Sequence, residues 1–162
     1  MKIFFFLFAI CFMMTACNQS GDHQQLQAKI DSLKAKLNDT YKPGLGEFMM
    51  GIQEHHAKLW FAGINKNWKL ADFEVHEIGE TLDDVKKYCT DRPEVKSLGI
   101  IDPAINNIKA AIGREDMEKF KSGFTELTND CNTCHNDNQH GFNIIIIPTS
   151  LPVTNQDFKP AN

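Results

Sequence analysis

Residues 115–135 read EDMEKFKSGFTELTNDCNTCH, and their pattern predicts a helix with a single apolar seam. Apolar residues recur three and four positions apart along the stretch, at Met117, Phe120, Phe124, Leu127, Cys131 and Cys134. Because an α-helix turns once in about 3.6 residues, this spacing places the six side chains on one face. We therefore expect the helix to bury that face, with both cysteines pointing into a core.

The same stretch ends in Cys131-Asn132-Thr133-Cys134-His135, a Cys-x-x-Cys-His motif. This is the motif at which haem c is attached. Each thiol adds to one vinyl group of the haem, and the histidine that follows offers a neutral imidazole nitrogen to the iron. The motif predicts one haem c per chain, covalently bound through Cys131 and Cys134, with His135 as the proximal iron ligand.

Two other uses of paired thiols stay open from the sequence. A redox dithiol normally lies in a βαβ context, which this sequence does not show. A zinc site would need a fourth ligand, which His140 could supply beside Cys131, Cys134 and His135. We rank both below haem because no second Cys or His pair at zinc-like spacing is present.

The first residues have the pattern of an export signal of the lipoprotein type. Lys2 gives a positive start, the apolar run Ile3 to Met14 is too short to span a bilayer permanently, and Thr15-Ala16-Cys17 resembles a lipobox. We expect residues 1–16 to be removed and Cys17 to carry lipid, which would hold the protein on the periplasmic or cell-surface side of a membrane. An ordinary cleaved signal, with Cys17 unmodified, is the alternative.

The charge balance points to protein partners. The formal net charge is −4, and removal of residues 1–16, whose only charge is Lys2, makes the mature chain more negative. A chain with this balance and no basic stripe is not expected to bind nucleic acid or anionic headgroups. We expect it to dock on periplasmic or membrane redox proteins whose own surfaces are basic or neutral.

Residues 17–44 are predicted to precede the main domain as a tether and a short helix. Residues 18–25 are polar and are expected to be flexible. Spacings of four, three and four then indicate a short heptad seam, formed by Leu26, Ile30, Leu33 and Leu37. So short a helix needs a partner, either the main domain or a second copy in a coiled coil, so a homo-oligomer through residues 26–37 is one expectation. Pro43 and Gly44 mark the boundary.

The main domain, residues 45–135, is predicted to hold four helices. The first spans about 45–64 and the second about 68–89, where acidic residues lie around an apolar seam and are read as a solvated face. Cys89, at the end of that seam, is expected to be buried. The third is short, with Asp102 as its cap, Pro103 at its first helical position and a buried stripe of Ile105, Ile108 and Ile112. The fourth runs from about Glu115 to the motif.

Apolar seams on helices joined by short links favour an all-α fold, an antiparallel up-down four-helix bundle. With the motif closing the last helix, residues 45–135 resemble the class II c-type cytochromes, the cytochrome c′-like family of four-helix bundles. The resemblance implies that the first helix supplies or withholds the sixth iron ligand. It implies Met49 in the low-spin case, and the helical wheel also places His56 on the core-facing side, so both are candidate distal ligands. His55 is expected at the boundary of that face.

The chain continues past the motif as residues 136–162. Asn143 to Pro148 contains four consecutive isoleucines, and the prolines that follow exclude a helix. We expect an extended C-terminal tail that is buried against the bundle or the haem edge. His140 in this tail is a third, lower-ranked candidate for the distal ligand.

These observations predict an electron-transfer protein rather than an enzyme. We expect a membrane-anchored periplasmic cytochrome c that passes one electron at a time. The alternative is a five-coordinate protein that binds or senses NO or CO, as the resemblance also allows. A di-iron bundle is not expected, because no Glu is followed by His three positions later.

Overall fold

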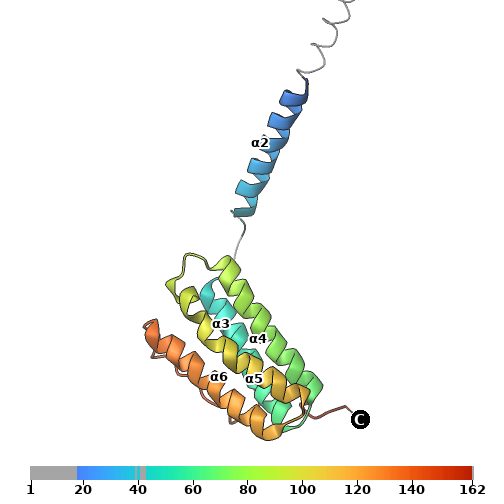
Figure 1. Cartoon of the computed structure of the whole chain (residues 1–162), viewed down its shortest axis with the longest axis vertical. Helices are drawn as coiled ribbons and strands as arrows, with labels where there is room; N and C mark the ends of the chain where they lie inside the picture. The colour runs from blue at the N-terminus through green and yellow to red at the C-terminus, as the bar shows by residue number, and fades with distance from the viewer. Residues whose placement is uncertain (1–17, 39, 41–42, 162) are drawn as a thin grey trace, which may run out of the picture. The chain divides into compact units, whose positions relative to one another are not determined.

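The computed structural model describes residues 18–38, 40 and 43–161, and these form helices joined by short links (Figure 1). No β-strand occurs in these ranges. The expected fold class, an all-α helical bundle, is therefore confirmed. The predicted signal segment 1–16 and the predicted lipid site Cys17 lie outside the described residues.

The chain divides into two compact units, residues 1–42 and residues 43–162. In the first unit, helix α2 runs from Asn18 to Asn38. Residues 18–25 are thus helical, and the prediction of a flexible tether there is wrong; three of these eight residues are Gln, which has a good helix propensity. The predicted seam lies on α2, with Leu26, Leu33 and Leu37 at 59%, 63% and 68% exposure.

The second unit begins with the helix pair α3 (Leu45–Ile64) and α4 (Trp68–Tyr88). The Glu47 carboxylate accepts a hydrogen bond from the Gly44 N–H at 3.1 Å, which fixes the start of α3. Three residues separate the helices, and Asn67 caps α4 by accepting a hydrogen bond from the Leu70 N–H at 3.3 Å. So short a link turns the chain back, and the two helices run antiparallel (Figure 1).

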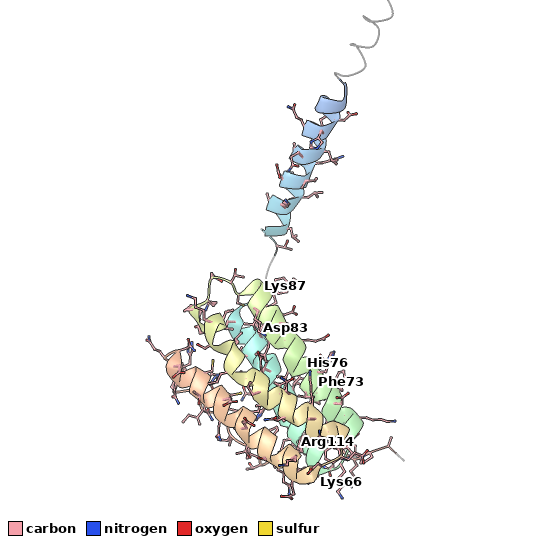
Figure 2. The ribbon with its side chains drawn as sticks, viewed as in Figure 1. Lys66, Phe73, His76, Asp83, Lys87 and Arg114 are labelled. Atoms are coloured by element: carbon pink, nitrogen blue, oxygen red, sulfur yellow. The ribbon has the colours of Figure 1, made fainter. Side chains whose placement is uncertain are left out.

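Helix α4 packs with its predicted seam inward. The seam side chains are buried, and they are Ala71, Val75, Ile78, Leu82 and Val85. Phe73, His76, Asp83 and Lys87 lie on the outer side of the helix (Figure 2). Cys89 follows at the C-cap, 4% exposed, so its predicted burial is confirmed.

A 3₁₀ segment, η1 (Pro93–Ile101), leads directly into α5 (Asp102–Gly113). The prediction that Asp102 caps α5 is wrong. Asp102 is the first residue of α5, because the chain is already helical at Ile101. The stripe of Ile105, Ile108 and Ile112 is buried as expected.

Helix α6 runs from Met117 to Asp137 and contains the whole motif. The Asp116 side chain caps it by accepting a hydrogen bond from the Lys119 N–H at 3.0 Å. Residues 114–116 form a short turn, so α5 and α6 are also antiparallel neighbours (Figure 1). Phe120, Phe124 and Leu127 are buried along the predicted seam.

The tail, residues 138–161, begins with turns as far as residue 142, has no regular secondary structure after them, and packs on the bundle at several points. Ile147 and Val153 pack against the core, and Phe158 is 3% exposed. The Asn67 side chain donates a hydrogen bond to the Lys159 carbonyl at 3.0 Å. The prediction that the whole isoleucine run is buried is wrong. Ile144 and Ile146 are exposed, because an extended segment turns alternate residues outward.

Among the described helices, none combines the length and the apolar character that crossing a bilayer requires.

Candidate functional site

A cavity of about 360 Å³ lies among α3, α4, η1, α6 and the tail. Much of its wall is apolar, formed by Leu45, Ile52, Ile78, Leu82, Leu98, Ile101, Leu127 and Ile145. Cavities of this size and lining are typical of sites for small molecules and cofactors. All the candidate site residues of the main domain and tail line it: Met49, His56, Cys131, Cys134, His135 and His140.

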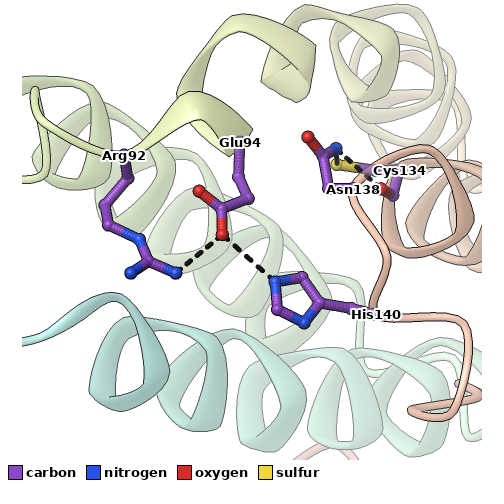
Figure 3. Close-up of polar contacts among 5 residues, drawn as sticks. All are labelled: Arg92, Glu94, Cys134, Asn138 and His140. Carbon is purple, nitrogen blue, oxygen red and sulfur yellow. Dashed lines mark hydrogen bonds and ion pairs between the residues drawn. The ribbon is translucent and has the colours of Figure 1, made fainter.

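The two motif cysteines lie on the inward face of α6. Cys134 is 7% exposed and Cys131 is partly buried against the core. Burial raises the pKa of the Cys131 thiol to about 12 and also raises the pKa of Cys134. Both groups are therefore neutral thiols at pH 7 in this arrangement. The Asn138 side chain, one turn later, donates to the Cys134 carbonyl at 2.8 Å (Figure 3).

His135 is held by a hydrogen bond to the tail. Its Nδ1 lies 2.6 Å from the carbonyl oxygen of Asn143. A carbonyl can only accept, so Nδ1 carries the proton and, in the neutral ring, Nε2 keeps its lone pair. Histidines that bind metals through Nε2 are commonly fixed in this tautomer by such a bond. The side chain therefore keeps Nε2 as the nitrogen that could bind a metal.

Asn132 fastens the same part of the tail to α6. Its side-chain amide donates to the Ile145 carbonyl at 2.8 Å, and its oxygen accepts from the Ile145 N–H at 2.8 Å. The pair of bonds sets the position of the tail two residues beyond Asn143. Sequence reasoning treated Asn132 as a spacer, and no local signal predicts a contact with a residue thirteen positions away.

The two candidate distal ligands on α3, His56 and Met49, differ in their hydrogen-bond partners. His56 is 3% exposed, and its Nε2 lies 3.0 Å from the Thr128 hydroxyl oxygen. That hydroxyl donates its proton to the Phe124 carbonyl at 2.9 Å, so it accepts from His56 and Nε2 is protonated. Desolvation by burial lowers the pKa of His56 to about 4. The His56 ring is therefore neutral at pH 7.

Met49 is partly buried and packs against the core on the same helix. In the described part of the chain, no hydrogen bond involves its sulfur. Ligation of a metal by His56 through Nε2 would require the bond to Thr128 to break. Ligation by Met49, or by His56 through its unprotonated Nδ1, has no such requirement, so both stay candidate ligands.

His140 belongs to a charged cluster at the edge of the cavity (Figure 3). One oxygen of Glu94 accepts from Arg92 at 2.7 Å and from His140 Nε2 at 3.1 Å. The pKa of Glu94 is lowered to about 2, first by a hydrogen bond from the backbone N–H of Glu94 itself and then by the hydrogen bonds from His140 and Arg92. Glu94 is 8% exposed, and within the described residues its Oε2 is a buried oxygen with no partner. It is thus a free acceptor in the cavity wall.

The zinc alternative is not assembled in this structure. Across the described ranges, no three His, Cys, Asp or Glu side chains are gathered as a directly bound metal ion would need. Haem iron takes its axial ligands from opposite sides of the ring and does not require such a cluster.

A hydrogen bond between α3 and α4 was missed by the sequence analysis. Glu74 on α4, which we had placed on the solvated acidic face, is 1% exposed. Its carboxylate lies 2.7 Å from Nδ1 of His55 on α3. Glu74 is therefore corrected from a surface charge to an inter-helix contact. His55 lies at the boundary, partly exposed, as expected.

Comparison of the chain with protein-family models, with curated proteins and with solved structures finds no match.

Proposed function

We propose that this protein is a c-type cytochrome with one covalently bound haem that transfers single electrons. The haem would be attached at Cys131 and Cys134 and would occupy the cavity, with His135 as its proximal ligand. The proposal does not assign an enzymatic activity. It rests on the motif and on the surroundings that the chain builds for it.

The observation that carries the proposal is the state of His135. Its Nδ1–H donates to the Asn143 carbonyl at 2.6 Å, while the ring and both cysteines line one cavity. Such a bond orients the ring and makes Nε2 a stronger donor to a metal. Two thiols and a metal-binding imidazole beside one cavity are the groups that covalent attachment of a haem requires.

The remaining residues fit a haem in this position. Haem supplies a redox-active iron, and its potential depends on the axial ligands and on burial. The apolar wall excludes water, and Met49 would be the sixth ligand, with His56 as the alternative. Met49 would give a higher midpoint potential than His56.

The proposed location is the outer side of a membrane. The signal pattern in residues 1–16 and the lipobox-like Cys17 support export and a lipid anchor. Haem is joined to c-type cytochromes on that side, so the two proposals support each other. Periplasmic or membrane redox proteins would be the partners. A homo-oligomer through residues 26–37 is consistent with the exposed seam of α2.

The test is a pyridine haemochrome assay, with absorption spectra, on protein expressed in cells that export and mature c-type cytochromes. We expect one haem per chain that survives denaturation. The double variant Cys131→Ala/Cys134→Ala should lose it, whereas Cys89→Ala, which changes a buried cysteine outside the cavity lining, should keep it. A colourless wild-type protein from these cells would refute the proposal.

A second candidate function is gas binding at a five-coordinate iron. The bond between His56 Nε2 and Thr128 supports it, because this nitrogen does not ligate the iron while the bond persists, and the iron would then be five-coordinate if Met49 also stayed unbound. The spectra of the reduced protein distinguish the two. A low-spin ferrous form that resists CO supports electron transfer, and a high-spin form that binds CO supports the gas binder. Met49→Leu should convert the first spectrum into the second.

A further inference from the structure

Three large apolar side chains of the tail point into solvent in a row. Phe142 is 84% exposed, Ile144 is 70% exposed and Ile146 is 64% exposed. Ile144 and Ile146 lie on the same side of an extended stretch, and Phe142 precedes them in the turn that ends at Asn143; we call these three exposed side chains the tail ridge. A cluster of exposed apolar side chains of this kind commonly marks a site of protein interaction.

The ridge is held in place by the residues between its members. The Asn143 carbonyl accepts from His135, both backbone polar groups of Ile145 bond to Asn132, and Ile147 packs on the core. With the inner side of the segment fixed in this way, the outer side cannot turn in to bury its side chains. The exposure of the ridge therefore follows from the fold.

The ridge is also directly connected to the proposed iron ligand. Asn143, which bonds to His135 at 2.6 Å, lies between Phe142 and Ile144 in the chain. One hydrogen bond and one or two residues thus separate His135 from the exposed side chains. A redox protein seated on the ridge would be coupled to the iron through this route.

The charges of the chain segment that carries the ridge favour one kind of partner. Between Lys121 and Lys159 the chain has no Lys or Arg, and its charged residues there are Glu126, Asp130, Asp137 and Asp157. Glu126, Asp137 and Asp157 are exposed. Arg92, which approaches the ridge through Glu94, His140 and Phe142, is paired with the Glu94 carboxylate, so this acidic segment favours a basic partner over a second copy of itself.

We propose that the tail ridge is the docking surface for a redox protein whose own contact patch is apolar and rimmed by lysines. This inference rests on the proposed electron-transfer function. The partner exchanges its electron through the segment that holds His135. Its contact is small and transient, as is usual for electron-transfer encounters.

The experiment measures electron transfer from the reduced holoprotein to a lysine-rimmed probe, mitochondrial cytochrome c, by stopped flow at low ionic strength. The triple variant Phe142→Ser/Ile144→Thr/Ile146→Thr should lower the second-order rate constant about tenfold, because the apolar centre of the contact is lost. Asp137→Asn should lower it less and should weaken its dependence on salt.

Two controls isolate docking from haem chemistry. Phe73, 53% exposed on the outer side of α4, offers the same kind of side chain elsewhere (Figure 2), and Phe73→Ser should leave the rate unchanged. The absorption spectrum of the triple variant and its rate of reduction by dithionite should equal those of the wild type.

The outcomes separate this inference from the proposed function. A wild-type protein without haem refutes the function itself. A haem-loaded triple variant that reduces cytochrome c as fast as wild type overturns the ridge as a docking surface. A ridge-dependent dimer in sedimentation, with an unchanged rate, also overturns the proposal, because the occupant would then be a second copy.

Discussion

The two ends of the α3–α6 pair differ in how they are filled. At one end, Trp60, Trp68 and Phe120 pack ring against ring, with centroids 6.4 Å apart for Trp60–Phe120 and 5.9 Å for Trp68–Phe120. At the other end, the same two helices carry Met49 and the motif cysteines around a cavity of about 360 Å³. The aromatic end can therefore hold the helices at a fixed separation while the cavity end stays open for a ligand.

The boundary between the two ends is the contact of His56 with Thr128 and Phe124. The His56 ring lies 4.4 Å from the ring of Phe124, between centroids, and 3.0 Å from the Thr128 hydroxyl, between Nε2 and oxygen. His56 thus packs its ring against the aromatic end and also forms part of the cavity wall. The predictions below test this division, in order of decreasing effect.

The largest effect is expected from Phe120→Ala at the aromatic end. Phe120 is 0% exposed, and its removal should lower the free energy of unfolding by about 3–5 kcal/mol. Ile52→Ala, at a half-buried position in the cavity wall, should cost clearly less. Urea unfolding measures both. Equal losses would show that the two ends contribute alike to stability.

The next effect is a dependence of stability on pH through His56. Its pKa falls from 6.5 to about 4 on folding, so the unfolded chain binds a proton that the folded chain does not. Stability is complete above pH 6.5, and about 3 kcal/mol of it should be lost as the pH falls from 6.5 to 4.

Urea unfolding at steps between pH 7 and pH 4 measures this loss. His56→Gln should flatten the profile in this range. Glu94, whose pKa is lowered from 4.5 to about 2, adds its own loss as the pH falls below about 4.5, at the lower edge of this range. A profile with the same slope in the variant would show that His56 does not titrate on unfolding as proposed.

Gly63→Ala and Gly51→Ala make the same change at the two ends of α3. A Cβ at Gly63 would overlap the ring of Phe120, which cannot move because other rings surround it. We expect a loss of about 1–3 kcal/mol from this overpacking. At Gly51 a Cβ meets nothing within 4 Å. There the better helix propensity of Ala should raise stability by up to about 1 kcal/mol. Thermal unfolding measures both variants. If the two substitutions moved the midpoint temperature in the same direction, the expectation would be contradicted.

The smallest effect is expected from Asn132→Ala, which releases the tail at the cavity end. Loss of two hydrogen bonds to Ile145 should cost about 1–2 kcal/mol. Faster amide hydrogen exchange at Ile145 would report the release directly. Asn129→Ala, at an exposed position on the same helix, should leave that exchange unchanged. Unaltered exchange in Asn132→Ala would show that the clamp does not hold the tail.

Much of the fold was predictable from local pattern. The bounds of α3 agree with the prediction, α4 ends one residue before the predicted end, and the cysteines lie on the inward face of α6. These features depend on residues within one or two turns of each other. The motif likewise identified Cys131, Cys134 and His135, and the wheel identified Met49 and His56, all of which line one cavity.

The contacts that complete the site were not predictable in this way. Glu74 was read as a surface charge, yet it pairs with His55 nineteen positions away, and Asn132 bonds to a residue thirteen positions away. The unpaired oxygen of Glu94 also depends on how η1 meets the tail. Which polar side chain finds which partner depends on helices and tail coming together in space.

The sequence by itself determined the helices and the face that each buries, because the periodicity of apolar side chains is a local property. It also supplied the motif on which the proposed haem site rests. Only the tertiary structure decided the tautomer of His135, the neutral state of His56 and the exposure of the tail ridge. Each of these follows from burial and from hydrogen bonds between segments that are distant in the chain.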